Sequence, residues 1–449
     1  MHDRVYPTRL ASSWRAHLLV VALLLSVVSA AGCTGSTGST SPASAGSAAT
    51  SGSAAAVGPA TTVPAGPPAG AVSSCPMQTT DQSPCYSPHQ LRVAYGIKPL
   101  LDSGIDGHGE TVTVLAPAPS STPGDAGTDI RQDLKALNNM FGLPAARIQI
   151  VTTLAGAAAP WQAGTEEVGD TEIVHMVAPA AALRVVLLPP GPSVFKNAAT
   201  ATADMIAGLR LAVSGTDVAS ISWSLGEHYF TRAQVAEMHS ILLGAAAHHV
   251  TVIGSSGDNG ALSDTDFGKP VKEVSLPASD PLVLGVGGTS LTVSPSGAYV
   301  SETAFDTGGG FSHLYARPAY QDGVPGISTM RGVPDVAADA DQPGPPTVFA
   351  GGSVVTNLGT SNSAPLWGGL IALADQYAHH DLGFVNPAIY RIGRGTSYHK
   401  AFHDITTGSN YVTIGSATAA GYQAGPGWDP VTGWGSPNAQ VLIPLLARG

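Results

Sequence analysis

Apolar and polar positions follow two different rhythms along residues 86–449. Short apolar runs rich in β-branched residues predict buried strands over residues 111–116, 183–188, 218–223, 250–254 and 282–286. Residues 199–214 and 232–248 repeat apolar side chains with the 3.6-residue period of a helix. This alternation predicts an α/β fold in which a doubly wound, mostly parallel sheet is flanked by helices. We expect residues 86–449 to form one large domain of this kind.

Residues 1–32 have a different pattern, in which a stretch with three arginines precedes an apolar run over residues 18–31. The run is too short for a membrane-spanning helix, which needs about 20 residues, and it is typical of a signal peptide. Small residues before Cys33 resemble a bacterial lipobox, which predicts a lipidated Cys33 as a membrane anchor. Ordinary cleavage nearby, with Cys33 as a bystander, is the alternative. Both interpretations predict an exported protein, extracellular or held at the outer face of the cytoplasmic membrane.

Residues 33–85 are expected to be a tether. Residues 34–72 are almost wholly Gly, Ser, Thr, Ala and Pro, a composition that cannot bury enough apolar surface to offset chain entropy. Cys75 and Cys85 follow, and in an exported protein we expect them to form a disulfide. A metal pair is the weaker alternative, because no further Cys or His lies at zinc-like spacing.

Charge excludes one class of function. The formal net charge is −11, and Lys and Arg form no cluster anywhere in the chain. A protein that binds nucleic acid without sequence preference needs a basic patch to neutralise phosphates. We therefore expect no nucleic-acid partner.

A glycine turn with serines precedes an apolar stretch near the C-terminal end. Residues 359–365 read Gly-Thr-Ser-Asn-Ser-Ala-Pro, and a helix is expected from residue 366 to about 378. A serine at such a turn exposes its hydroxyl beside the helix N-terminus, where the dipole favours negative charge. Ser361 is therefore a candidate nucleophile.

A nucleophilic serine needs a base, and no histidine lies in the required context. Asp102 and His108 imitate part of a subtilisin pattern. Both precede the strand predicted at residues 111–116, so they would lie at the wrong end of the sheet. We interpret them as a false match.

Two acidic residues occupy the matching chain position instead. Glu166 and Asp170 are four residues apart, so on a helix they share one face. Two close carboxyls cannot both ionise easily, and such a pair can act as the base for a serine at acidic pH. For this spacing alone, a solvated acidic helix face is the alternative, and Glu167 and Glu172 are expected to be of that ordinary kind.

Asp258 lies in a Ser-Gly-Asp loop directly after the strand predicted at residues 250–254. Subtilisins place an Asn in this loop to donate a hydrogen bond to the oxyanion. An ionised Asp would repel the developing negative charge, whereas a protonated one can donate to it. Asp258 therefore points to acidic conditions, as the Glu166 and Asp170 pair does.

Glu166-x-x-x-Asp170, Ser-Gly-Asp258 and Gly-Thr-Ser361, in this order, resemble the sedolisin family of serine-carboxyl peptidases, over nearly all of residues 86–446. The resemblance implies a subtilisin-like fold and a monomeric endopeptidase that hydrolyses proteins or peptides through an acyl-enzyme. Ser361 would be the nucleophile and Glu166 its general base and acid. Asp170 would orient Glu166 and share its proton, and Asp258 would be the oxyanion donor.

The resemblance also implies one structural Ca²⁺ site near the C-terminal end. Ca²⁺ prefers six or more oxygen ligands. Two carboxylates, three backbone carbonyls and water would supply them, from Asp404, Ile405, Gly425, Gly427 and Asp429. From spacing alone, ordinary loop turns are the alternative.

The chain departs from the family pattern in several respects. Leu358 replaces a Gly before the nucleophile motif, and Asn362 replaces the common Ala after the serine. Residues 1–85 contain no counterpart of the folded prosegment. Ala116 aligns with a Glu that extends the proton-sharing network, and Ser275 aligns with an acidic residue that shapes the P1 pocket in some members. A catalytically weak or inactive lipoprotein of the same fold, acting as a binding module, is therefore the alternative function.

Overall fold

The computed structural model describes residues 61–62, 75, 84–117, 128–152, 163–188, 197–263, 270–349, 352–414 and 417–448. All of them belong to one compact unit, Val57–Gly449. The predictions for residues 1–32, for Cys33 and for most of the tether fall outside the described residues. Among the helices described, none is long and apolar enough to cross a membrane.

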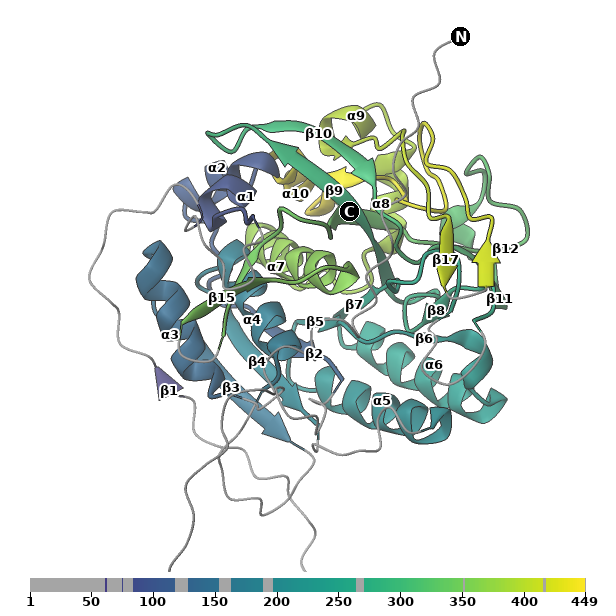
Figure 1. Ribbon diagram of the computed structural model, residues 1–449, viewed down its shortest axis with the longest axis horizontal. Helices are drawn as coiled ribbons and strands as arrows, with labels where there is room; N and C mark the ends of the chain where they lie inside the picture. Colours follow the sequence, from purple (N-terminus) through teal and green to yellow (C-terminus); the bar gives the residue numbers. More distant parts are fainter. Residues whose placement is uncertain are drawn as a thin grey trace, which may run out of the picture. The chain divides into compact units, whose positions relative to one another are not determined.

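A nine-stranded sheet lies at the centre of the described part of this unit (Figure 1). Its order is β1-β3-β4-β2-β5-β7-β9-β10, and β13 also pairs with β9. The first and last pairs of this order are antiparallel, and the other pairs are parallel. The strands are β1 Thr61–Thr62, β2 Thr111–Leu115, β3 Arg147–Thr152, β4 Ala182–Leu187, β5 Val218–Ile221, β7 Thr251–Ser255, β9 Leu284–Val293, β10 Tyr299–Ala304 and β13 Val336–Asp339.

The predicted mostly parallel α/β fold is confirmed. Each central strand is buried along nearly its whole length, as in β5 and β7, because helices cover both faces of the sheet. Several boundaries differ from the sequence prediction. The helix expected from residue 366 begins at Thr360, so Ser361 lies inside its first turn. The strand expected at residues 282–286 begins at Leu284 and continues to Val293, because its outer half pairs with β10.

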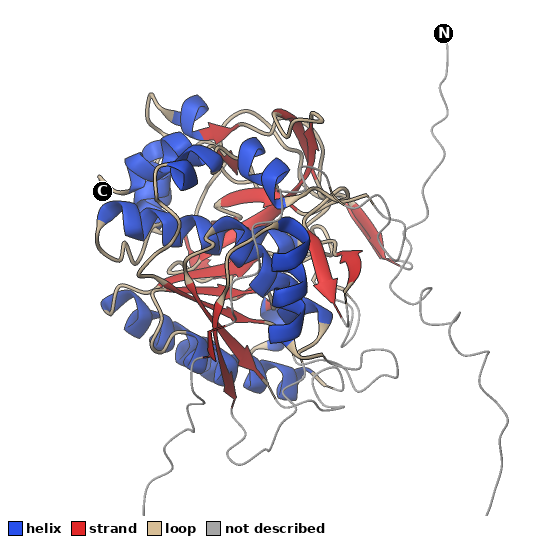
Figure 2. Cartoon of the chain, turned by 90° about the vertical axis from the view of Figure 1, so that its left-hand side faces the viewer, coloured by secondary structure: helices blue, strands red, loops and turns tan. Residues whose placement is uncertain are grey.

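Helices lie on both sides of the sheet (Figure 2). Those that carry the site or pack beside it are α4 Thr165–Val177, α7 Thr360–Ala378, α5 Ala198–Ala212 and α6 Arg232–Ala247. Val112 and Val114 of β2 belong to the core cluster that contains α4 and α7. Leu115 of the same strand belongs to the cluster that contains α5 and α6.

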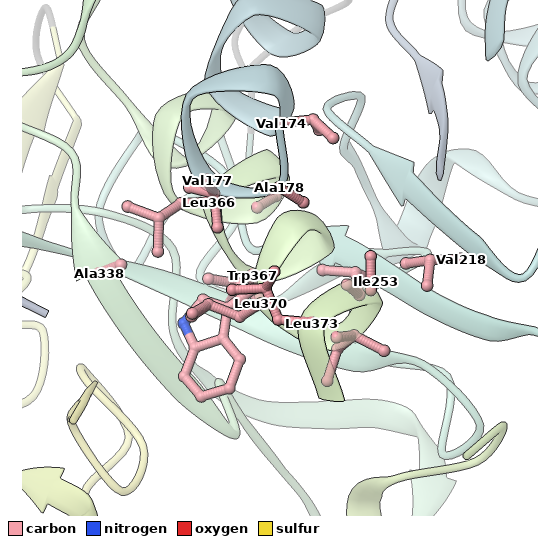
Figure 3. Close-up of a cluster of buried hydrophobic side chains, with 14 of the residues drawn as sticks. Val174, Val177, Ala178, Val218, Ile253, Ala338, Leu366, Trp367, Leu370 and Leu373 are labelled. Carbon is pink, nitrogen blue, oxygen red and sulfur yellow. The ribbon is translucent and has the colours of Figure 1, made fainter. Parts of the chain in front are cut away.

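Helix α7 is buried almost throughout. Figure 3 shows Leu366, Trp367 and Leu370 of this helix packed with Val174 and Val177 of α4. The two helices approach closely because Gly369 of α7 has no side chain: a Cβ there would lie 2.6 Å from Val177 Cβ. This close packing fixes the first turns of α7, which follow Gly359, against α4.

The remaining elements surround this core. The other helices are α1 Pro88–Ala94, α2 Lys98–Asp102, α3 Ile130–Phe141, α8 Asn386–Gly393, α9 Tyr398–Ala401 and α10 Ala439–Leu446, with 3₁₀ turns at Glu227–Tyr229 and Ala319–Gln321. The short strands are β6 Leu225–Gly226, β8 Ser275–Leu276, β11 Gly310–Ala316, β12 Met330–Val333, β14 Pro346–Phe349, β15 Ser353–Thr356, β16 Phe402–His403, β17 Val412–Ile414, β18 Ala417–Ala419 and β19 Ser436–Pro437.

Cys75 and Cys85 form a disulfide, with their Cα atoms 5.6 Å apart. The chain after Cys85 is attached to the domain, since the Tyr86 amide donates to the Gly344 carbonyl at 2.8 Å.

Candidate active site

The four predicted catalytic residues meet at the carboxyl edge of the parallel strands. Asp258 follows β7, Glu166 and Asp170 lie in the first two turns of α4, and Ser361 lies in the first turn of α7. Open α/β sheets place their ligand sites at this edge. The fold therefore brings together four residues that are far apart in the sequence.

Ser361 is held at the N-terminus of α7, where it is half-buried. The preceding Gly359 has φ +113°, a conformation that favours glycine. A Cβ at this position would lie 2.5 Å from Asp258 Oδ2. Glycine is therefore required both for the turn and for the close approach of Asp258.

Asp258 is fixed to the same turn through Thr360. The Thr360 amide donates to Asp258 Oδ1 at 2.7 Å, and its hydroxyl donates to the same oxygen at 2.8 Å. The Asp258 side chain reaches the molecular surface, yet the surrounding protein is dense. Desolvation raises its pKa despite the opposing hydrogen bonds from Thr360.

Glu166 interacts directly with Ser361. Desolvation raises the pKa of Glu166 to about 7, the hydrogen bond with the Ser361 hydroxyl opposes this rise, and the Asp258 charge adds to it. Its Oε1 atom is buried and has no hydrogen-bond partner among the described residues. The carboxyl next to the serine is therefore one that exchanges a proton easily.

Asp170 lies one helical turn beyond Glu166 and is buried. Desolvation raises its pKa well above the usual value, the Glu166 charge raises it further, and Ser222 opposes the rise. Ser222 directly follows β5 and was not predicted from the sequence. A serine after a buried strand at the carboxyl edge of the sheet is the signal that could have indicated it.

Glu167 and Glu172 are not solvated residues, contrary to the expectation from the sequence. Both are buried, with at most 1% of either exposed. Glu167 accepts a hydrogen bond from the Gly164 amide at the start of α4, and Glu172 accepts one from the Val348 amide. The expectation was wrong because α4 is covered on every side.

Asp102 and His108 lie away from the cluster of Glu166, Asp170, Asp258 and Ser361. This position agrees with the prediction that they are a false match to the subtilisin pattern. Both are exposed. The amides of Asp106 and Gly107 in the same turn donate to Gln376 Oε1 near the end of α7, each at 2.7 Å. Ser361 lies fifteen residues earlier on that helix, about 22 Å away at 1.5 Å per residue.

A surface depression of about 100 Å³ lies beside the Ser-Gly-Asp loop. The Gly308 amide donates to the Gly257 carbonyl at 2.6 Å, and the two following glycines line the depression. Its lining residues are Ala261, Lys272, Glu273, Gly309, Gly310, Phe311, His313 and Tyr422.

The two predicted halves of the calcium site converge on one loop. The Gly427 amide donates to both oxygens of Asp404 at 3.1 and 3.2 Å, and the Gly425 amide donates to Asp429 Oδ2 at 3.2 Å. Burial raises the pKa of Asp429 to about 6. These hydrogen bonds bring the segment of Asp404 and the segment of Asp429 together, and carboxylate oxygens are ligands that a hard cation prefers.

Comparison with known proteins agrees with this geometry. No family model matches the chain. The chain is 34% identical to kumamolisin of Bacillus sp. (strain MN-32) over 297 residues, which is 62% of this chain and 51% of kumamolisin. It is 32% identical to human (Homo sapiens) tripeptidyl-peptidase 1 over 256 residues, 51% of this chain and 43% of that protein. The chain thus spans about half the length of the curated relatives it matches.

The structural comparison covers more of the chain. Pseudomonas sedolisin, a serine-carboxyl proteinase solved with two molecules of pseudo-iodotyrostatin, aligns with a TM-score of 0.66 at 26% identity, over 81% of this chain and 98% of sedolisin. The fold is therefore the subtilisin-like α/β fold of serine-carboxyl proteinases. In sequence and in fold the chain is thus similar to the sedolisin family of serine-carboxyl peptidases.

Proposed function

We propose that the chain is an exported, acid-acting serine-carboxyl endopeptidase that cleaves proteins or peptides. The observation that carries this proposal is the pairing of the Ser361 hydroxyl with the Glu166 carboxyl. A half-buried hydroxyl at a helix N-terminus, paired with a carboxyl that can take its proton, is the minimum that acyl transfer needs.

The reaction has two halves. The Ser361 oxygen attacks the peptide carbonyl carbon as its proton passes to Glu166, and the carbonyl electron pair moves onto oxygen. Collapse of this intermediate breaks the C–N bond, and Glu166 returns the proton to the leaving amine. Glu166 then takes a proton from water, whose oxygen attacks the acyl carbon of the acyl-enzyme. When the ester C–O bond breaks, Glu166 gives that proton to the Ser361 oxygen, which releases the acid and restores the free serine.

Asp170 is proposed to position Glu166 and to share its proton. One buried oxygen of each carboxyl lacks a hydrogen-bond partner among the described residues, and the Glu166 charge raises the pKa of Asp170. A singly protonated pair satisfies both conditions, because its one negative charge is spread over two residues.

Asp258 is proposed to donate a hydrogen bond to the oxyanion. Its Oδ1 atom accepts from the Thr360 amide and hydroxyl, which leaves Oδ2 to carry the proton. The pKa of Asp258 is raised, so the protonated donor persists to higher pH than in an ordinary Asp. Activity should decline when this proton is lost, which confines the enzyme to acidic pH.

One structural Ca²⁺ is proposed at the C-terminal loop. Asp404 and Asp429 would supply carboxylate oxygens, and Ile405, Gly425 and Gly427 would supply backbone carbonyls. The ion would cross-link the two segments that already meet through the hydrogen bonds of Asp404 and Asp429. It would act on stability and take no part in the chemical steps.

A serine-directed covalent probe tests the assignment of the nucleophile. At acidic pH the probe should label the unaltered chain on Ser361 and should fail to label Ser361→Ala. Ser363→Ala is the matched control, since Ser363 lies on the same turn, is fully buried and donates to the Thr360 carbonyl. Equal labelling of Ser361→Ala, or no labelling of a folded unaltered chain at any pH, would contradict the proposal.

A further inference from the structure

A second acidic cluster lies at the amino edge of the sheet, at the end of α7 opposite Ser361. Glu110 directly precedes β2, Asp375 lies in the last turn of α7, and Asp381 follows that helix. One carboxylate oxygen from each of the three lies within 4.8 Å of the others. None of these residues belongs to the proposed active site or to the proposed C-terminal calcium loop.

Asp375 is the buried member of the cluster, with no exposed surface. Its Oδ1 atom accepts a hydrogen bond from the Leu382 amide at 2.9 Å. Its Oδ2 atom is buried and has no hydrogen-bond partner among the described residues. A buried carboxylate oxygen without a partner is costly, so this atom requires either a proton or a cation that the protein chain does not supply.

The residues around this cluster add further negative charge and supply no paired positive charge within the described part of the chain. Across the described ranges, no Lys, Arg or His forms an ion pair with Glu110, Asp375 or Asp381. Asp217 lies close enough for its charge to act on Glu110 and Asp375, and its own Oδ2 accepts a hydrogen bond from the Thr111 amide. The C-terminus of a helix is the negative end of its dipole, where a cation is favoured and an anion is not.

The chemistry of the cluster suits a hard cation, because Ca²⁺ and Mg²⁺ both prefer carboxylate oxygens. Ca²⁺ accepts six to eight oxygen ligands in a flexible arrangement, whereas Mg²⁺ requires near-ideal octahedral geometry and keeps several waters. Three carboxylate oxygens from separate segments, all within 4.8 Å of one another, therefore favour Ca²⁺. Glu110 and Asp381 are half-buried, so water can complete the coordination.

We propose that Glu110, Asp375 and Asp381 bind a Ca²⁺ ion, in addition to the ion proposed at Asp404 and Asp429. The ion joins the start of β2 to the end of α7 and neutralises the buried Asp375 carboxylate. It anchors the helix that carries Ser361 from its far end. Its role is in stability, and the inference does not depend on peptidase activity.

Calcium binding to the full chain tests this site directly. The protein is stripped with a chelator, dialysed, and titrated with CaCl₂ by calorimetry near neutral pH. In the Asp404→Asn/Asp429→Asn background, one ion per chain should still bind. Adding Asp381→Asn should abolish that binding, whereas Asp102→Asn, which removes an exposed carboxylate paired with Lys98, should leave it unchanged.

Two results would overturn the site. One is a folded Asp404→Asn/Asp429→Asn chain that binds no Ca²⁺ up to about 10 mM, beyond the range of weak extracellular calcium modules. The other is binding that survives Asp381→Asn, which would show that the remaining ion is held elsewhere. If the double background fails to fold, Asp381→Asn alone decides the matter: the number of ions bound should fall by one per chain, and an unchanged number contradicts the proposal.

Discussion

At the scale of single residues, the proposed chemistry depends on which carboxyl groups of the site hold a proton. Glu166, Asp170 and Asp258 all have raised pKa values, in each case chiefly through desolvation. No Lys, Arg or His pairs with them in the described part of the chain. In a site made of carboxyl groups alone, the base is stabilised by a proton that two groups share. In a histidine-based site, the base becomes a cation when it accepts the serine proton.

Glu166→Gln should lower kcat by about 10²- to 10⁴-fold, the usual contribution of general acid–base catalysis. The amide has nearly the same shape but cannot accept the serine proton, so KM should change little. Steady-state kinetics on a peptide substrate measures both constants. Glu237→Gln, an exposed residue paired with Arg210, is the control. A Glu166→Gln enzyme that retains most of its kcat would exclude Glu166 as the base.

Asp258→Asn and Asp258→Ala should differ in their pH profiles. Deprotonation of Asp258 removes the oxyanion donor as pH rises, whereas the Asn amide donates at every pH. The Asn variant should therefore retain activity further towards neutral pH, and the Ala variant should be weak throughout. Profiles of kcat/KM against pH test this difference, and superimposable profiles for the two variants would contradict the role of Asp258.

At the scale of elements, the site depends on the close packing of α4 against α7. Glu166 lies on one helix and Ser361 on the other, so the separation of the helices sets the distance between the reacting groups. Gly369 lies at the contact with Val177. A side chain there would force the helices apart or strain them.

Gly369→Ala should lower the free energy of unfolding by about 1–3 kcal/mol through overpacking, and it should lower kcat as well. Gly244→Ala is the matched control: it lies in helix α6, and an added Cβ there meets no atom within 4 Å. That change should be neutral or stabilise by up to about 1 kcal/mol. Denaturant unfolding compares the two variants. Equal stability would show that the helix contact can relax.

The elements differ in how far the sequence could predict them. Strands β2, β4, β5 and β7 were predictable because strands buried on both faces are continuous apolar runs. Strand β3 contains Arg147 and Gln149 and lies nearer the sheet edge, so its apolar pattern is broken. Strand β13 is only four residues long, and its place beside β9 depends on pairing across the domain.

The site was partly predictable for a related reason. Glu166, Asp170, Asp258 and Ser361 occur in local motifs whose order could be compared with a family. Burial of Glu172 could not be predicted, because a spacing argument assumes a solvent-facing side and α4 has none. The cluster of Glu110, Asp375 and Asp381 comes from distant segments without a motif, and only the topology brings them together.

At the scale of the whole molecule, buried carboxyls should make the metal-free protein more stable at acidic pH. The ordinary values are 4.5 for Glu166 and 3.8 for Asp375, and in the folded protein their pKa values rise to about 7 and about 8. At a pH between the ordinary and the raised pKa, each of these carboxyls is protonated in the native state and ionised in the unfolded chain. The free energy of unfolding therefore falls as pH rises from about 4 to about 8.

One group acts in the opposite direction. Burial lowers the pKa of His175 from 6.5 to about 4, so its contribution is lost as pH falls through that range. The carboxyls are more numerous, and the net trend should follow them. Denaturant unfolding in chelator at mildly acidic and mildly alkaline pH tests this trend, and greater stability on the alkaline side would contradict it.

Chelation should lower the melting temperature, because an ion that binds only the folded state stabilises it by mass action. Calorimetric scans from micromolar to millimolar Ca²⁺ should show a rising midpoint. The shift should be smaller in Asp404→Asn/Asp429→Asn. A midpoint that does not respond to Ca²⁺ would count against both proposed ion sites.

Cleavage of an unstructured protein across a pH series, with the unaltered chain and Ser361→Ala compared side by side, tests the proposed peptidase most directly. The unaltered chain should cleave the substrate only at acidic pH, and the variant should not cleave it at any pH. Residual turnover by pure Ser361→Ala would contradict the assignment of the nucleophile. If the folded, calcium-loaded unaltered chain cleaves nothing at any pH, the proposed peptidase activity is contradicted and a binding module with the same fold is favoured.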